Sequence, residues 1–197
     1  MTPEQFEARV RAAADPEGRL PVPEQAGWEI FPFERDDLRV KPLEPVVLPE
    51  PPRNGEGGRP CFACPVDEAR VAWSSERWVL VGAVTGLPFE ASLLPRAHLE
   101  LGDLDDVHAA ELGQLVVRLD RAVRALPAVA RLHVNKWGDG GSHLHVVLMG
   151  RPAGLLQLRG SNLALWEEML PRVPEAESAA AVRQVAEELE AWGGSAT

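Results

Sequence analysis

Residues 102–127 constrain the fold more than any other stretch, because they predict one long amphipathic helix. Apolar side chains recur there with the period of a helix that covers one face of a core. They are Leu112, Leu115, Val116, Leu119, Ala122, Val123 and Leu126. Aspartates load the first turn, arginines load the last turn and Pro127 follows, as helix ends prefer. Such a helix needs a sheet or other helices to bury its apolar face.

Runs typical of β-strands lie on both sides of this helix. They are at 71–84, 89–98, 130–137 and 143–150. The first run predicts either two short strands around a Ser-Ser turn or one strand after a bend, and Pro95 ends the second. The last two runs flank a glycine turn and indicate a hairpin. Further helices are predicted at 161–170 and 175–192. This order indicates an α+β fold with an antiparallel sheet, one long helix and C-terminal helices.

Composition divides the chain into three parts. Residues 1–60 combine a predicted short helix at 3–14 with an N-terminal arm dense in proline and glycine, which suits neither a helix nor a central strand. This stretch is either an extended arm that ends in a flexible loop at "NGEGG" or a mobile linker. Residues 61–152 are expected to form the main domain, and 153–197 a C-terminal helical extension.

The charge balance narrows the classes of partner. Thirty acidic against twenty basic residues give a net charge of −10, which argues against a nucleic-acid polymer as the ligand. No apolar run is long enough for a transmembrane helix, so no membrane partner is expected. The N-terminus "MTPEQFEARVRAA" lacks the apolar core of a signal peptide, so we expect a cytoplasmic protein. A phosphate would need a local pocket on such an acidic protein.

Two histidines stand one residue apart at the start of the predicted strand 143–150. Side chains of a strand alternate between its faces, so His143, His145 and Val147 share one face. The opposite face, directed to the core, carries Leu144, Val146 and Leu148. Two histidines on the same strand face, close after the glycine turn "GDGG", indicate a functional site. The turn itself is either a nest of backbone amides for an anion or an ordinary hairpin turn.

The run "HLHVVLMGR" resembles the histidine triad (HIT) motif, in which histidines alternate with apolar residues and an arginine often follows. His143 takes the first triad place, His145 the second, Val147 the third, and Arg151 that of the arginine. Upstream, "LLPRAHLELGDLD" is similar to the strand before the family's long helix, and "HVNKWGDGG" to its asparagine and glycine segment. "CFAC" with the following run is similar to the domain's opening. The resemblance covers about residues 61–152. It implies a HIT-like fold. HIT domains commonly pair through the long helix and a sheet edge, so a homodimer is one expectation; the alternative is that the arm or the terminal helices block that surface.

Val147 departs from the family motif. In the related galactose-1-phosphate uridylyltransferases this place holds glutamine, so it varies among active relatives. Valine neither donates nor accepts a hydrogen bond, and it cannot hold a phosphate oxygen or a leaving group. We therefore expect a weak or altered activity.

Cys61 and Cys64 have the spacing of metal or redox cysteines in a reducing compartment. Together with His98 and His143 they make the Cys2His2 set that suits tetrahedral Zn²⁺. Zinc-containing HIT proteins and the uridylyltransferases resemble this layout. The resemblance thus implies a structural Zn²⁺ held by these four residues. The alternatives are a redox pair, or buried reduced thiols beside a surface His98.

The resemblance also implies that His145 is a nucleophile. A neutral imidazole would attack the α-phosphorus of a nucleotide or nucleoside phosphate, and the nucleotidyl-histidine would pass its group to water or another acceptor. The expected phosphate donors are Asn135, Gly140, Gly141, Ser142 and Arg151. The predicted function is a nucleotide hydrolase or nucleotidyltransferase. One alternative is a zinc-stabilised module that binds a nucleotide without cleaving it. Another is a scaffold whose arm and terminal helices carry the function.

Overall fold

The computed structural model describes residues 12, 14–19, 21–22, 24–27, 31, 33, 38, 42 and 45–197. Contacts divide the chain into two compact units, Met1–Pro51 and Pro52–Thr197. The first unit contains the short 3-10 helix η1 (Glu24–Gly27). The helix predicted at 3–14 lies outside the described residues, apart from Ala12 and Ala14. The predicted main domain and the C-terminal extension both lie in the second unit.

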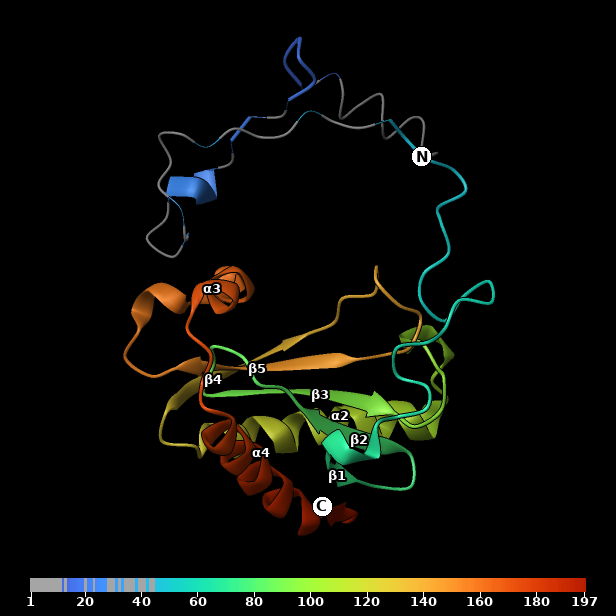
Figure 1. Cartoon of the computed structure of the whole chain (residues 1–197), viewed down its shortest axis with the longest axis vertical. Helices are drawn as coiled ribbons and strands as arrows, with labels where there is room; N and C mark the ends of the chain where they lie inside the picture. The colour runs from blue at the N-terminus through green and yellow to red at the C-terminus, as the bar shows by residue number, and fades with distance from the viewer. Residues whose placement is uncertain are drawn as a thin grey trace. The chain divides into compact units, whose positions relative to one another are not determined.

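Six strands of the second unit form one antiparallel sheet (Figure 1). They are β1 (Val71–Ser74), β2 (Trp78–Gly82), β3 (Phe89–Pro95), β4 (Val129–Asn135), β5 (Val146–Pro152) and β6 (Ser195–Ala196). Their order across the sheet is β4-β5-β3-β2-β1-β6. The run 71–84 therefore forms two strands, and β4 pairs with β5 as the predicted hairpin requires. The prediction of an α+β fold with an antiparallel sheet is confirmed.

The helices of this unit begin and end close to their predicted positions. They are α2 (Asp106–Arg124), α3 (Leu163–Met169) and α4 (Glu175–Glu190), with the 3-10 helices η2 (Glu68–Arg70), η3 (Leu101–Asp103), η4 (Leu156–Leu158) and η5 (Gly160–Asn162). The carboxylate of Asp105 caps α2, because it accepts a hydrogen bond from the His108 N–H at 2.8 Å. Arg121 and Arg124 in the last turn complement the helix dipole. Within the described part of the chain, no helix is both long and apolar enough to cross a membrane.

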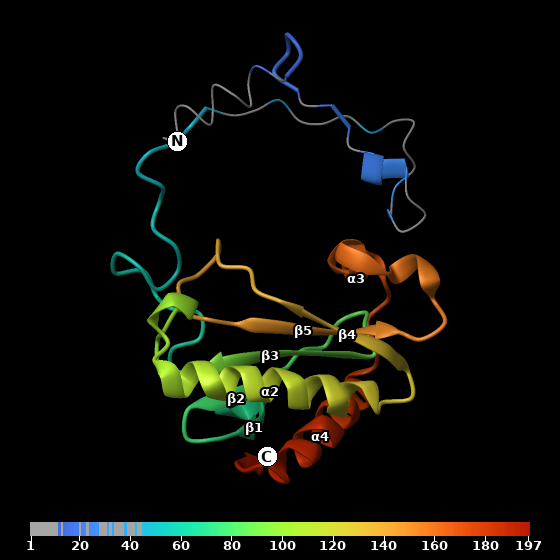
Figure 2. The ribbon, with the colours of Figure 1, turned by 180° about the vertical axis from the view of Figure 1, so that it is seen from behind.

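The two faces of the sheet are covered by different helices (Figure 2). One face packs against α2 and α4 around a core that includes Phe89, Leu119, Val123, Leu148, Val185 and Leu189. Leu144 and Val146 belong to the same core, as their alternation along the strand predicts. The opposite face packs against α3 through a smaller cluster of Leu87, Met149, Leu158 and Leu163. Each such fully buried side chain contributes about 1.5–3 kcal/mol of transfer free energy.

The histidine strand begins later than its sequence predicts, at Val146 instead of His143. The residues before it pair with segments other than β4. The Ser142 N–H donates to the Asn54 carbonyl at 2.9 Å, and the Leu144 N–H donates to the Leu99 carbonyl at 2.8 Å. These bonds hold 142–144 against the loop before Cys61 and the segment after β3. Both histidines therefore lie just ahead of β5, where three segments of the chain meet.

Candidate metal centre and nucleophilic histidine

Three segments that are far apart in the sequence bring two cysteines and two histidines together. Cys61 and Cys64 lie on the turn before η2, His98 follows β3 and His143 precedes β5. Their four ligand atoms all lie within 4.8 Å of one another. The Sγ atoms of Cys61 and Cys64 lie 3.5 and 3.2 Å from Nδ1 of His143. The Sγ atom of Cys64 also lies 3.5 Å from Nδ1 of His98.

A backbone hydrogen bond fixes the orientation of the buried His143 ring. Its Nε2 lies 2.8 Å from the carbonyl oxygen of Pro95, which can only accept, so Nε2 carries the proton. The lone pair of Nδ1 is then directed at the two sulfur atoms. Burial, the largest cause, lowers the pKa of His143; the hydrogen bond to Pro95 opposes this shift, and the nearby His98 and His145 add to it. The ring is therefore held neutral, the form in which imidazole binds a metal.

A chain of two hydrogen bonds orients His98 in the same way. The Ser142 hydroxyl donates to the Asn54 carbonyl at 3.2 Å, so its oxygen is left to accept from Nε2 of His98 at 3.1 Å. Nδ1 of His98 is then the lone-pair nitrogen, and it faces Cys64. A partner on the second ring nitrogen is the usual support of a metal-binding histidine.

Three sulfur–nitrogen distances in the cluster are close to those around a tetrahedral metal ion. Bonds of about 2.0–2.1 Å to nitrogen and 2.3 Å to sulfur place the ligands of a tetrahedral Zn²⁺ about 3.3–3.8 Å apart. The sulfur–nitrogen distances of 3.2–3.5 Å lie at this spacing or just below it. Four protein ligands leave no open coordination position, which is the arrangement of a structural site.

The protonation of Cys64 couples metal binding to pH. Desolvation of its Sγ atom, followed by the hydrogen bond and charge of Cys61, raises the pKa of Cys64 to about 11. A zinc ligand must be a thiolate, so an ion that binds here releases the Cys64 proton. The Ala63 N–H already donates to the Sγ atom of Cys61 at 3.3 Å. That bond becomes charge-assisted once the sulfur is ionised.

His145 lies next to this cluster without belonging to it. Its Nδ1 lies 2.9 Å from the His143 carbonyl oxygen, so Nδ1–H donates and the lone pair of Nε2 stays available. The ring is half-buried, and the ring of Phe62 meets it edge-on at a centroid distance of 5.3 Å. The structure thus assigns the two histidines different surroundings: one faces sulfur, and the other keeps a basic nitrogen outside the cluster.

A comparison with solved structures identifies the fold. A histidine triad protein from Bradyrhizobium japonicum is 20% identical, with 60% of this chain and 88% of that chain covered and a TM-score of 0.50. The chain has the histidine triad (HIT) fold. A Zn-bound histidine triad family protein from Mycobacterium smegmatis is 15% identical, with 64% and 90% of the two chains covered and a TM-score of 0.48.

A uridylyltransferase mutant is 23% identical, with 62% of this chain and 44% of that chain covered and a TM-score of 0.43. No protein-family model and no curated protein matches the sequence.

The third triad place of this HIT fold is apolar but has polar neighbours on the adjacent strands. Val147 pairs with Ser92 of β3 on one side and with Asn135 of β4 on the other. Residues directly opposite each other in an antiparallel sheet share a face, so the side chains of Ser92 and Asn135 lie on the same face as Val147. Ser92 and Asn135 are half-buried, and neither side chain has a hydrogen-bond partner in the described part of the chain. Asn135 was predicted as a donor. Ser92 was not, because only the strand register brings it beside Val147.

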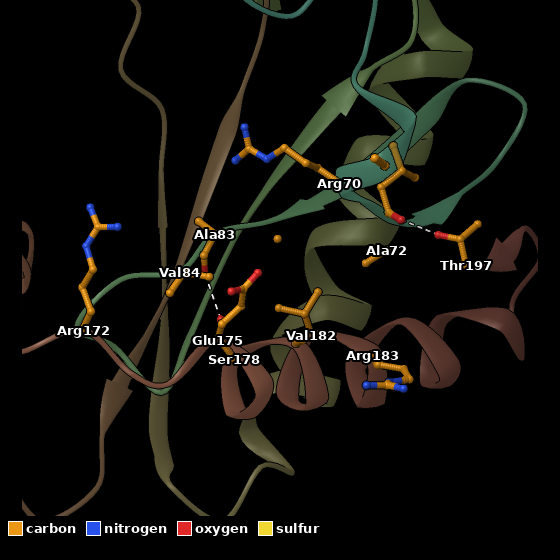
Figure 3. Close-up of a pocket in the computed structure, with 14 residues that line it drawn as sticks. Arg70, Ala72, Ala83, Val84, Arg172, Glu175, Ser178, Val182, Arg183 and Thr197 are labelled. Carbon is orange, nitrogen blue, oxygen red and sulfur yellow. Dashed lines mark hydrogen bonds between the residues drawn. The ribbon is translucent and has the colours of Figure 1, made fainter.

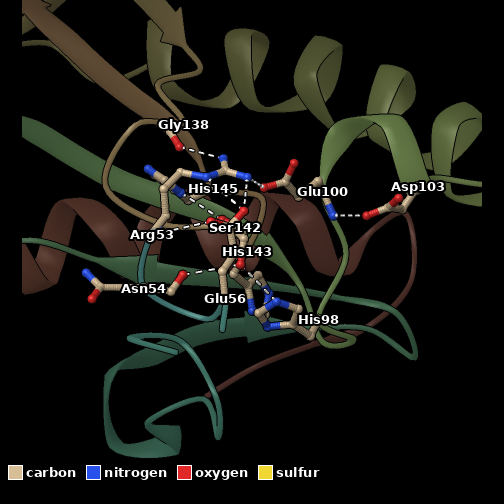
Figure 4. Close-up of polar contacts among 10 residues, drawn as sticks. All are labelled: Arg53, Asn54, Glu56, His98, Glu100, Asp103, Gly138, Ser142, His143 and His145. Atoms are coloured by element: carbon tan, nitrogen blue, oxygen red, sulfur yellow. Dashed lines mark hydrogen bonds and ion pairs between the residues drawn. The ribbon is translucent and has the colours of Figure 1, made fainter. Parts of the chain in front are cut away.

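A loop that the sequence places in the arm also belongs to the HIT site. Arg53 donates from Nη1 to the Gly138 carbonyl at 2.8 Å and forms an ion pair with Glu100 at 2.5 Å (Figure 4). Its Nε and backbone N–H both donate to the Glu56 carboxylate, at 3.0 and 2.7 Å. These bonds from Arg53 hold the pKa of the Glu56 carboxyl below its usual range. The loop is therefore fastened to both the glycine turn and the segment after β3.

The glycine turn is shaped by this loop. Gly141 forms a parallel bridge with Asn54, and a Cβ atom on it would lie 2.5 Å from the ring of Phe62. Only glycine admits so close an approach. The amide and hydroxyl of Ser142 are already bonded to Asn54, so this predicted phosphate donor instead supports the metal site. The Gly140 and Gly141 N–H groups have no partner in the described part of the chain.

Arg151 lies far along β5 from His145. Six residues of strand separate it from His145, which corresponds to about 20 Å. Its buried guanidinium donates from Nη1 to the carbonyls of Pro152 and Leu155, at 3.1 and 3.5 Å. Its charge adds to burial in lowering the pKa of His133 on the adjacent strand β4. Of the predicted phosphate donors, the structure does not bring Arg151 to the site.

Proposed function

We propose that the chain is a nucleotide hydrolase or nucleotidyltransferase that works through a covalent nucleotidyl-histidine on His145. The observation that carries this proposal is the hydrogen bond from Nδ1–H of His145 to the His143 carbonyl at 2.9 Å. It leaves Nε2 as the basic nitrogen, and a fixed, neutral imidazole is what nucleophilic attack needs.

The reaction has two displacements at phosphorus. Nε2 of His145 forms a bond to the α-phosphorus while the bond to the leaving group breaks with its electron pair. Water or another acceptor then attacks the same phosphorus and releases the histidine. In this proposal the N–H groups of Gly140 and Gly141 donate hydrogen bonds to the phosphate oxygens. Ser92 and Asn135 are the groups beside Val147 that can donate to the leaving group.

The metal in this proposal is Zn²⁺ on Cys61, Cys64, His98 and His143, and its role is structural. When bound, it ties the turn before η2, the segment after β3 and the start of β5 together. His143 contributes to both the metal site and the catalytic site, because its ring faces the sulfur atoms and its carbonyl accepts a hydrogen bond from His145. A fixed His143 therefore fixes the direction of the nucleophile.

The covalent intermediate supplies the test. The protein is incubated with the four nucleoside 5′-phosphoramidates and with UDP-glucose, quenched in alkaline denaturant and analysed as peptides by mass spectrometry. We expect one nucleotidyl group on the peptide that contains His145. His145→Ala should lose the adduct and the turnover by at least 10³-fold while keeping its zinc. His133→Ala, on the neighbouring strand, is the matched control and should keep both. Turnover by the His145→Ala variant would refute the assignment.

One observation favours a second function, nucleotide binding without turnover. Val147 packs against the apolar cluster of Leu87, Met149, Leu158 and Leu163 and offers nothing to a leaving group. In that case nucleoside monophosphates would raise the melting temperature of the protein, while none of the five substrates would be consumed or leave an adduct.

A further inference from the structure

A cavity of about 570 Å³ lies between η2, the start of β1, the end of β2 and the N-terminal half of α4 (Figure 3). Its lining residues include none of the metal ligands and none of the groups around His145. The volume is within the range of about 300–1,000 Å³ that is typical of small-molecule sites. The cavity is therefore a candidate binding site separate from the HIT centre.

The floor of this cavity is apolar and firmly held. Val71, Ala83 and Val182 contribute to it, and Val182 packs closely on Gly82 of β2. The buried hydroxyl of Ser178 donates to the Ala83 carbonyl at 3.0 Å, which fastens α4 to the chain just after β2. A ligand with an apolar portion can rest on these side chains without first ordering them.

Three arginines from three segments line the same cavity. Arg70 ends η2, Arg172 precedes α4 and Arg183 lies on α4 (Figure 3). In the described part of the chain, none of these guanidinium groups makes a hydrogen bond or an ion pair. Other arginines of this acidic chain are paired with carboxylates, as Arg77 is with Glu111 and Arg96 with Glu68.

The side chains that line the cavity favour an anion. Glu175 is the only acidic side chain among them, against three guanidinium groups, so they keep an excess of positive charge even with the α-carboxylate of Thr197, which also lines the cavity. A phosphomonoester carries about −1.5 to −2 at neutral pH, and the guanidinium fork pairs with its oxygens in a bidentate manner. The first turn of α4, with Glu175 and Ser178, adds the positive end of a sixteen-residue helix.

We propose that this cavity binds a small organic phosphomonoester, with its phosphate on Arg70 and Arg172 and its apolar portion on the floor. Arg183 adds to the positive electrostatic potential at the phosphate. Glu175 accepts a hydrogen bond from a hydroxyl of the ligand. This site lies beyond the proposed reaction and does not depend on turnover at His145.

The test uses the full chain and phenyl phosphate, with benzoate and benzyl alcohol as reference compounds, by isothermal titration calorimetry. Phenyl phosphate is expected to bind saturably, benzoate at least fivefold more weakly, and benzyl alcohol without saturation. In the double variant Arg70→Ala/Arg172→Ala the affinity for phenyl phosphate should fall at least tenfold. The matched control is Arg59→Ala/Arg121→Ala, which removes the same charge from two exposed arginines outside the cavity and should change the affinity less than twofold.

Several results would overturn the proposal. One is the absence of saturable binding to the parent protein, and another is an equal loss in both double variants, which would indicate general attraction between charges. A third is equal affinity for benzoate. A loss in His145→Ala that the arginine variant does not show would place the phosphate at the histidine instead. Because the four arginines are exposed, both double variants should keep the parent melting temperature, which circular dichroism checks.

Discussion

His143 serves two neighbours at once. Its Nδ1 faces two cysteine sulfur atoms, its Nε2–H is held by the Pro95 carbonyl, and its own carbonyl accepts from His145. The ring and the backbone carbonyl of His143 thus have different partners: the ring faces the cysteines, and the carbonyl holds His145. A change that shifts the backbone at His143 would therefore disturb both the ring that faces the sulfur atoms and the carbonyl that orients His145.

The hydrogen bond from His98 to the Ser142 hydroxyl can be tested by removing one oxygen atom. Ser142→Ala removes the acceptor of His98 Nε2–H, so the ring can adopt the other tautomer and turn its lone pair away from Cys64. The parent protein is expected to purify with one zinc ion per chain. The variant should hold zinc about 10–100-fold more weakly, in the range of lost outer-shell partners. A competitive chelator titration measures this, and an unchanged affinity would contradict the role given to Ser142.

Substitution of Ser92 tests whether its hydroxyl supplies the hydrogen bond that Val147, at the third triad place, cannot make. If its hydroxyl donates to the leaving group in place of the residue at 147, Ser92→Ala should lower kcat about tenfold or more. Stability should change by less than about 1 kcal/mol, because the hydroxyl has no partner in the described part of the chain and so no buried bond is lost. Ser161→Ala, at an exposed position of η5, is the control. Steady-state kinetics with the preferred substrate measures kcat for both variants. An equal decrease in Ser92→Ala and Ser161→Ala would contradict the role given to Ser92.

At the scale of elements, the sequence predicts what local forces decide. The period of the apolar residues, the Asp105 cap and the terminal arginines all act within α2, so its limits are found to within a few residues. The start of β5 is decided elsewhere. Residues 142 and 144 donate to Asn54 and Leu99, and alternation along the strand carries no information about these distant partners. Ser92 escaped prediction for the same reason.

The loop at 53–60 is the element whose effect on the site can be tested most sharply. Gly55 and Gly58 both have left-handed backbones, with φ of +90° and +81°. A Cβ atom on Gly55 would lie 2.6 Å from Oγ of Ser142 and 2.7 Å from Cε1 of His98, whereas one on Gly58 meets nothing within 4 Å. Both alanine variants therefore carry the same backbone strain of about 1–2 kcal/mol. Only Gly55→Ala should also weaken zinc binding, by about tenfold or more.

Zinc content and chemical denaturation of the two glycine variants are measured side by side. Equal zinc affinity in both would mean that the loop does not press on His98. A greater loss in Gly58→Ala would contradict the contact outright.

At the scale of the whole molecule, the Cys2His2 cluster was predictable and the loop that supports it was not. The chain has only two cysteines, and the HIT resemblance selects His98 and His143 from its five histidines. Arg53 and Asn54 carry no such signature. Their partners Gly138 and Ser142 lie more than eighty residues away, and a composition rich in proline and glycine assigns them to the arm. The compact unit that contains the site nevertheless begins at Pro52.

Truncation tests whether residues 52–60 belong to the N-terminal arm, as their composition indicates, or to the compact unit that contains the site. A chain that begins at Pro52 should keep the zinc and the melting temperature of its HIT domain, because every described hydrogen bond of the site lies within Pro52–Thr197. A chain that begins at Cys61 loses the bonds of Arg53 and Asn54 to the glycine turn and to Glu100. At about 0.5–1.5 kcal/mol for each net hydrogen bond, the three bonds between Asn54 and the segment 140–142 alone amount to about 1.5–4.5 kcal/mol.

The shorter chain should therefore melt about 5–15 °C lower and bind zinc more weakly, since Ser142 would lose the acceptor that orders its hydroxyl. Differential scanning calorimetry and zinc titration of the two chains decide the matter. If both behave alike, residues 52–60 are a linker that merely passes the site. If only the shorter chain is weakened, the ninety-residue stretch that carries the HIT resemblance is incomplete without the loop before it, and the metal centre belongs to a longer domain than its motifs indicate.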